Sequence, residues 1–314
     1  MAGWLSTFKS KLTDLLGRTP SAHVGVFGKH VGWNDHIDDL GLDSEPLVAA
    51  KQALYVHGIG GVVDSGKWEP ATPEEPALGF RHIFVWRDQT NILFGRLWDS
   101  SDGKGRTKYP MIICAHWSAR PEPGIPDALA FLETLETECR KATTADEVHR
   151  IVSTAKLSAA QYLNTPAPIA GPRTAFAQQL GLTLDSEHAA RIAYAAQNTF
   201  GAMKNASADI ALSLTPDKLQ PQHLRVPADL KQPLASIVFW QDFLAAFIGD
   251  TTPQFFLASL DSPWLDIIVG PLTPKHLACI RSGGQTVPVA TDIPFNIVPA
   301  DREKAGKCWA AFLG

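Results

Sequence analysis

The sequence predicts an α/β protein, with a mixed β-sheet flanked by helices and a helical insertion in the middle of the chain. Strand-like apolar runs and helical patterns are interleaved towards both ends of the chain, which is typical of this class. Between residues 81 and 117, three strand-like runs follow one another with no helix between them, so we expect a mixed sheet. Residues 126–232 are rich in alanine and mainly helical in pattern. We expect the 314 residues, 1–314, to form a single domain.

An amphipathic helix is predicted within residues 1–20. Gly17 and Pro20 would end this helix. It could pack on its own domain, or it could dock on a membrane surface or a partner, and the sequence leaves both interpretations open. The apolar positions that recur at helical spacing are Trp4, Leu5, Phe8, Leu12, Leu15 and Leu16.

The first half of the chain then alternates between strands and one helix. Residues 23–28 form a short apolar run, and residues 45–56 have a helical pattern with Asp43 or Ser44 as the N-cap. Residues 81–87 and 91–98 are expected to pair as a hairpin. Residues 110–117 are almost continuously apolar, so we expect a central strand that is covered on both faces.

Helices are predicted through the middle of the chain, and strands return towards its end. The helical stretches 126–163 and 175–201 are separated by prolines at 166, 168 and 172. From residue 234 onward, the elements that we expect are strands at 235–240, 255–260 and 265–269, a helical segment at 241–249, either a helix start or a strand at 273–281, and a terminal helix at 302–313.

Composition narrows the classes of function. The net charge is −4 with 45% hydrophobic residues, which gives no electrostatic reason to expect nucleic-acid binding. The four cysteines are far apart, and we interpret them as buried thiols in a reducing compartment. No apolar run is long enough for a transmembrane segment, and no signal-peptide pattern opens the chain. We therefore expect a cytoplasmic protein, and nothing in the sequence calls for a cofactor.

Two short stretches carry most of the functional information, residues 27–36 and 102–110. Each combines glycine, charge and an aromatic residue at the end of an apolar run. Such side chains on turns are typical of a recognition surface. The second stretch resembles a phosphate-binding loop, but its glycine spacing is wrong and a strand follows it instead of a helix. Its basic residues Lys104, Arg106 and Lys108 fit a solvated turn, and phosphate binding by another geometry stays open.

An enzymatic alternative rests on His30, Asp35 and His36. Imidazole and carboxylate groups together can hold a divalent metal or transfer protons, which would suit a metal-dependent hydrolase. The spacing matches no standard zinc pattern. The same side chains could instead hydrogen-bond the loop backbone.

Two of the nine tryptophans, Trp33 and Trp68, lie in polar loops. The others lie in apolar runs or beside turns, and we assign most of them to the core. Trp33 and Trp68 are candidates for an exposed recognition surface, although packing explains them equally well.

The order of these features resembles the TagF-type accessory proteins of bacterial type VI secretion. In that family a strand leads into Gly-Lys-x-Pro-x-x-Gly-Asp-Phe, and Gly28, Lys29 and Asp35 match it, with Val31 in place of the proline. A Gly-Arg-Tyr-Phe-Pro segment follows in the family, and residues 105–110 fit it with one additional residue. A Ser-x-Trp-Trp element is echoed loosely by residues 236–240. The resemblance covers about residues 23–118 and 234–281.

This resemblance implies a non-enzymatic accessory or regulatory protein of a type VI-like secretion machine that acts in the cytoplasm by binding proteins. It implies a single α/β domain in which the two motif stretches support each other, for example through a hydrogen bond from Arg106 to Asp35. A groove between them would receive a partner. The residues that we assign to partner binding or to the structure of the motif are Gly28, Lys29, His30, Trp33, Asp35, His36, Trp68, Arg106, Tyr109 and Pro110.

Overall fold

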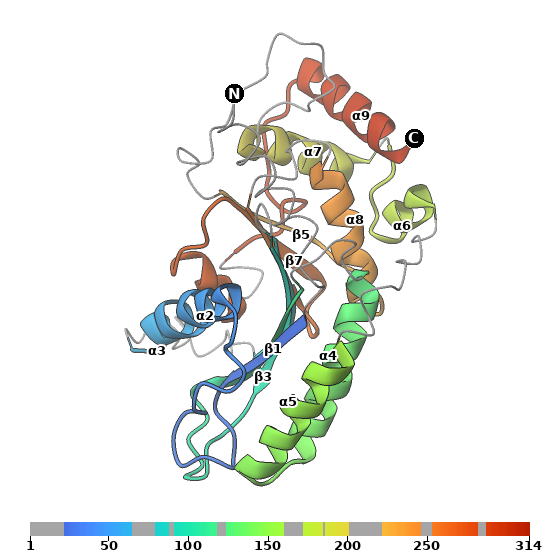
Figure 1. Cartoon of the computed structure of the whole chain (residues 1–314). Coiled ribbons are helices and arrows are strands. Elements are labelled where there is room, and N and C mark those ends of the chain that lie inside the picture. Colours follow the sequence, from blue (N-terminus) through green and yellow to red (C-terminus); the bar gives the residue numbers. More distant parts are fainter. Residues whose placement is uncertain are drawn as a thin grey trace, which may run out of the picture.

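A computed structural model describes most of the chain (Figure 1). The described residues are 22–64, 79–87, 91–117, 124–159, 172–184, 186–200, 222–245, 253–281 and 287–314. The amphipathic helix predicted within residues 1–20 and the loop that carries Trp68 lie outside these residues.

A seven-stranded sheet forms the centre of the protein, which confirms the α/β class. Its order is β1-β4-β3-β2-β6-β7-β5, and every pair of these described strands is antiparallel. We expected mixed pairing, but the strands on either side of the helical region also join the sheet in antiparallel directions. The strands are β1 (Ala22–Gly28), β2 (Arg81–Arg87), β3 (Ile92–Asp99), β4 (Pro110–Trp117), β5 (Gln222–Pro227), β6 (Gln254–Ser259) and β7 (Trp264–Val269).

The first four strands follow the sequence pattern closely. The predicted hairpin is β2 paired with β3, in a register that places Phe84 opposite Gly95. All eight residues of β4 are buried, because this apolar strand lies between β1 and β3 and is covered on both faces. The continuous apolar run therefore gave the correct element and the correct position within the sheet.

Helices cover both faces of this sheet, and each face has its own apolar core. One core packs against α4 (Ile125–Lys141), α5 (Ala145–Ala159), α7 (Glu187–Phe200), α8 (Pro233–Ala245) and α9 (Pro299–Leu313). The other packs against α2 (Glu45–Ala50), the π-helix η1 (Lys51–Gly60) and the 3₁₀-helix η5 (His276–Arg281). Figure 1 shows α2 with α3 (Gly61–Asp64) on the side of the sheet opposite α4 and α5. The short helix α6 (Arg173–Gln179) lies beside α8 through an ion pair of Arg173 with Asp242.

One prediction in the second half of the chain is wrong, and another is incomplete. Residues 235–240 belong to helix α8 and not to a strand. Apolar side chains surround this helix, so it has no clear helical period, because both its sheet side and its α9 side are covered. Conversely, β5 is a strand inside the segment 126–232 that we interpreted as a helical insertion. Its six residues are too few to stand out against the surrounding helical pattern.

The remaining elements refine the predictions. The helix expected at 45–56 continues as a π-helix to Gly60, and residues 273–281 end in the 3₁₀-helix η5. The terminal helix begins three residues earlier than expected, at Pro299. Its Trp309 is buried and packs beside Trp240 and Phe243 of α8. Within the part of the chain that the structure describes, no helix combines the length and apolar character needed to cross a bilayer.

Candidate functional site

Strand pairing brings the two motif stretches together. The first stretch leaves the end of β1 and the second enters the start of β4, and these strands pair antiparallel with Gly28 opposite Met111. Gly28 has a φ of 112°, where a Cβ would collide with the Pro110 carbonyl. The next residue, Lys29, donates its backbone N–H to that carbonyl at 3.0 Å. The topology therefore fixes both stretches at one end of the sheet.

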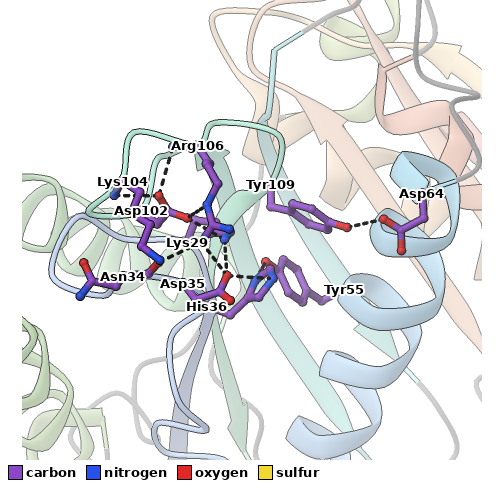
Figure 2. A network of polar contacts seen from close by, with 10 residues as sticks. All are labelled: Lys29, Asn34, Asp35, His36, Tyr55, Asp64, Asp102, Lys104, Arg106 and Tyr109. Carbon is purple, nitrogen blue, oxygen red and sulfur yellow. Dashed lines mark hydrogen bonds and ion pairs between the residues drawn. The ribbon is translucent and has the colours of Figure 1, made fainter.

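Four charged side chains connect the two stretches (Figure 2). The Lys29 ammonium is buried and donates to Asp35 Oδ1 at 2.7 Å and to Asp102 Oδ2 at 2.8 Å. Arg106 donates through Nε to Asp102 Oδ2 at 2.7 Å and through Nη2 to Asp35 Oδ1 at 3.0 Å. The expected bond from Arg106 to Asp35 is thus present, but as one side of a closed ring of two cations and two carboxylates.

Backbone contacts tighten the same junction. Gly103 donates its N–H to the Trp33 carbonyl at 2.7 Å, and the Arg106 guanidinium donates to the Asn34 carbonyl at 2.9 Å. The part of the first stretch that follows β1, residues 29–36, and the second stretch, residues 102–110, are called the paired loops below.

The second loop cannot act as a phosphate cradle, because the Asp102 carboxylate already occupies the position that a phosphate would take. Asp102 Oδ1 accepts the backbone N–H groups of Lys104 and Arg106, at 2.9 and 3.1 Å. Backbone N–H groups of this kind would have to face the phosphate in a phosphate loop. The resemblance to such a loop therefore reflects a carboxylate-capped turn, and the open option of phosphate binding has no geometric support here.

The ring of charges keeps both carboxylates ionised. Burial alone would raise the pKa of Asp102, but hydrogen bonds from Lys29 and from the backbone and side chain of Arg106 outweigh it and hold this pKa well below its usual range. The hydrogen bond from Lys29 lowers the pKa of Asp35 as well. Opposite charges thus cancel within the ring at neutral pH.

His30 does not join Asp35 and His36 in a common site. Its ring is buried, Nε2 hydrogen-bonds the Cys139 carbonyl at 3.0 Å, and Nδ1 accepts the Gly32 N–H at 3.1 Å. Burial lowers its pKa and favours the neutral ring. Both ring nitrogens are therefore occupied, and His30 attaches the first loop to the end of α4 rather than offering a metal ligand.

His36 lies in a small aromatic cluster beside the ring of four charged side chains. Its Nδ1 is 2.6 Å from the Tyr55 hydroxyl, and its ring stands edge-on to those of Tyr55 and Tyr109. Tyr109 in turn donates its hydroxyl to Asp64 at 2.9 Å (Figure 2). Burial raises the pKa of Tyr109 to about 12, so this hydroxyl stays protonated. His36 Nε2 is 3.7 Å from Asp35, so these two residues are neighbours.

Sequence reasoning missed Tyr55, Asp64 and Asp102 as members of this site. Asp102 stood at the first position of the second stretch, and its glycine neighbours were the signal that it caps a turn. Tyr55 and Asp64 come from η1 and α3, which meet the loops only through tertiary packing. No local pattern could have indicated them.

The other predicted residues of the site have structural roles where the structure describes them. Trp33 is partly buried, packs against the core, and lies 5.7 Å from the His30 ring and 5.9 Å from the His149 ring between centroids. Pro110 opens β4 and is buried. Trp68 is not among the described residues.

A second buried polar cluster lies near the opposite edge of the sheet, on β5, β7 and η5. The Arg225 guanidinium donates two hydrogen bonds of 2.9 Å to the Asp266 carboxylate. His223 donates a third through Nε2 to the same carboxylate at 2.6 Å. Cys279 completes a group of three potential metal ligands with His223 and Asp266. However, the guanidinium already neutralises Asp266, and burial raises the pKa of the Cys279 thiol well above its usual range. This cluster is a structural ion pair.

Comparisons with known proteins assign no family to this chain. No protein-family model matches it, and no curated protein matches it. Among solved structures, the crystal structure of PA0076 from Pseudomonas aeruginosa PAO1 aligns with 46% of this chain and 64% of its own, at 19% identity and a TM-score of 0.32. The alignment thus spans less than two thirds of that protein. This degree of similarity supports no inference about fold or function.

Proposed function

We propose that this chain is a cytoplasmic, non-enzymatic accessory or regulatory protein of a type VI-like secretion machine, and that it acts by binding another protein through its paired loops. The reference to type VI secretion rests on the resemblance of residues 28–35 and 105–110 to the TagF-type motifs. The motif residues of both stretches meet at one surface, as expected of a shared binding element.

One observation carries the binding role above all others. Lys29, Asp35, Asp102 and Arg106 satisfy one another in a closed ring, so these charges hold the loops in one conformation instead of standing ready to react. A rigid surface loses little conformational entropy when a partner binds. The half-buried Tyr109 at its edge is the kind of residue that anchors protein interfaces.

The alternative of a metal-dependent hydrolase has less support from this geometry. It requires His30, Asp35 and His36 around one ion, and His30 has both ring nitrogens in other hydrogen bonds. Asp35 is already shared by Lys29 and Arg106, whose positive charges would repel a cation.

The test is affinity capture of the tagged full chain from its native cells, followed by mass spectrometry. We expect wild type to enrich components of the secretion apparatus. The double variant Asp35→Ala with Arg106→Ala should lose them, because it opens the exposed side of the ring. The matched control is Arg81→Ala with Asp261→Ala, which removes an exposed pair of the same chemistry, 2.7 Å apart, on another part of the surface.

Two results would contradict the proposal. One is capture in which wild type enriches no component of such a machine. The other is substrate turnover by the purified chain that His36→Ala abolishes while the fold stays intact.

A further inference from the structure

A cavity of about 600 Å³ lies between α4, α8 and the sheet, and its lining residues lie outside the paired loops. Figure 1 shows α4 and α8 one after the other along the same side of the sheet. Two neighbouring strands form the floor of this cavity, because Ile83 of β2 lies opposite Arg96 of β3 in the register and both residues line it. A cavity of this volume is typical of sites for small ligands.

Arg96 brings an incompletely used guanidinium to this floor. Its side chain is only 8% exposed, and its Nε donates to Glu136 Oε2 at 2.6 Å. Nη1 is 3.9 Å from Glu133 Oε2, which is too far for a hydrogen bond. Neither Nη1 nor Nη2 has a hydrogen-bond acceptor among the residues that the structure describes. A buried donor without an acceptor is costly, so this arrangement indicates a ligand that supplies one.

The first turn of α8 presents two more unused donors to the same cavity. The helix begins with a proline, and the N–H groups of Leu234 and Ala235, which follow it, lack acceptors within the described part of the chain. Both residues line the cavity. The nearby Asp229 carboxylate does not cap them, because it accepts the Lys231 N–H at 2.8 Å in the turn before the helix. The donors of α8 and of Arg96 therefore meet at one cavity.

The charges favour a ligand with a single negative charge. Arg96 shares Glu136 with Arg140, which donates to the other carboxylate oxygen at 2.8 Å, so these three side chains together keep one positive charge. The positive end of the α8 dipole adds to it. The charges nearer to solvent include more carboxylates than cations, which disfavours a doubly charged ligand such as phosphate. They are Arg81, Lys231, Glu133, Asp229 and Asp261.

The walls of the cavity are mainly apolar. They include Pro126, Leu230, Leu234, Val238 and Leu260. Leu230 is 45% exposed, although it precedes a helix that is otherwise well packed. A ligand with an apolar chain would remove part of this surface from water, which favours binding.

We propose that this cavity binds a monocarboxylate with a short apolar chain, whose carboxylate accepts hydrogen bonds from Arg96 and from the first turn of α8. The planar guanidinium suits a carboxylate, because two of its N–H groups can meet both oxygens. A free carboxylic acid and the C-terminus of a polypeptide offer the same chemistry. This site is separate from the paired loops, so its failure would leave the proposed function in place.

Calorimetric titration of the purified full chain with hexanoate at pH 7 tests the proposal. We expect one hexanoate to bind per chain. Hexan-1-ol and hexylamine should bind at least about tenfold more weakly, because neither offers a negatively charged acceptor. The amide signals of Leu234 and Ala235 in ¹⁵N NMR spectra should shift as hexanoate is added, which locates the carboxylate at the start of α8.

Two variants test the floor and the wall separately. Arg96→Gln should weaken hexanoate binding at least about tenfold. Because this change also removes a partner of Glu136, Ala235→Leu serves as a second variant that keeps every charge and fills the cavity from α8. It should weaken binding as well. The matched control, Ala311→Leu, adds the same side chain at an exposed position of α9 and should bind as wild type does.

A short peptide with a free C-terminal leucine, and the same peptide as its amide, identify the source of the carboxylate. Tighter binding of the free peptide than of hexanoate supports a polypeptide C-terminus, and binding of hexanoate alone supports a free acid. Three results overturn the inference: binding of neither acid, binding of hexan-1-ol as tight as that of hexanoate, or hexanoate binding that neither Arg96→Gln nor Ala235→Leu weakens. Displacement of hexanoate by an equal concentration of inorganic phosphate overturns it in favour of a general anion site.

Discussion

Lys29 shows how one side chain can couple segments that are 73 residues apart in sequence. Its ammonium is buried at the junction of the paired loops, where an unpaired charge would be very costly. Asp102 and Asp35 make its burial tolerable, and Arg106 balances the second negative charge. The stability of the paired loops therefore depends on ionised carboxylates.

We expect Asp102→Asn to destabilise the chain at pH 7 several times more than Asp261→Asn does, because Asp261 belongs to an exposed pair. The pKa of Asp102 is lower in the folded chain than in the unfolded chain, whose value is about 3.9. Its contribution to stability is therefore present above that value and is lost as the pH falls towards the folded-state pKa. Urea unfolding at pH 7 and pH 3 should show the difference between wild type and Asp102→Asn shrinking in acid. A difference that is equal at both pH values would contradict this account.

Asp35→Asn provides a second test of the ring of charges formed by Lys29, Asp35, Asp102 and Arg106. Burial and the charge of Lys29 lower the pKa of His36, whereas the negative charge of Asp35 raises it. Removing that negative charge should lower the pKa of His36 further. Titration of the His36 ring by NMR measures this directly. An increase in the pKa of His36 would show that Asp35 does not act on this ring as the geometry indicates.

How much of this site the sequence predicts depends on which contacts are local. The pairing of the two loops and the bond from Arg106 to Asp35 were expectations implied by the motif resemblance, and the structure contains this bond. The burial of His30 against the Cys139 carbonyl was not predictable, since α4 is more than 100 residues away. A histidine beside an aspartate looks the same in sequence whether it binds a metal or a carbonyl oxygen.

At the scale of elements, strands were predictable where period and length agreed. A central strand was predicted correctly at residues 110–117. A strand was also predicted at residues 235–240, but these residues form part of a buried helix. A short run that is apolar on every side fits both structures, and tertiary packing decides between them. The sheet register also depends on single residues, and Gly95 is one of them.

Gly95→Ala should destabilise the sheet by about 1–3 kcal/mol, because the new Cβ would overlap the buried ring of Phe84 on the neighbouring strand. Gly306→Ala is the matched control with the opposite sign. It lies in helix α9 with nothing within 4 Å of the new Cβ, so it should stabilise by about 0.5–1 kcal/mol. Free energies of unfolding from urea titrations test both changes. Equal effects at the two positions would mean that β2 and β3 do not pair in this register.

At the scale of the whole molecule, the four cysteines report on whether the chain unfolds as one unit. All are buried free thiols, on β4, α4, η5 and α9, and thus on the sheet, on both of its faces and on the terminal helix. Burial raises the pKa of Cys139 and Cys308 to about 12, so neither is a reactive thiolate at pH 8. If the chain is a single domain, all four cysteines should become exposed in the same unfolding transition.

We therefore expect a thiol reagent at pH 8 to label none of the four cysteines quickly in the native chain and all four in 6 M guanidinium. At intermediate urea concentrations, labelling resolved by mass spectrometry should give one midpoint for Cys114, Cys139, Cys279 and Cys308, because the two cores share the same sheet. Cys308 labelling at a clearly lower urea concentration than Cys114 would show that α9 and its neighbours unfold separately. In that case the single domain would have to be divided into two cooperative units.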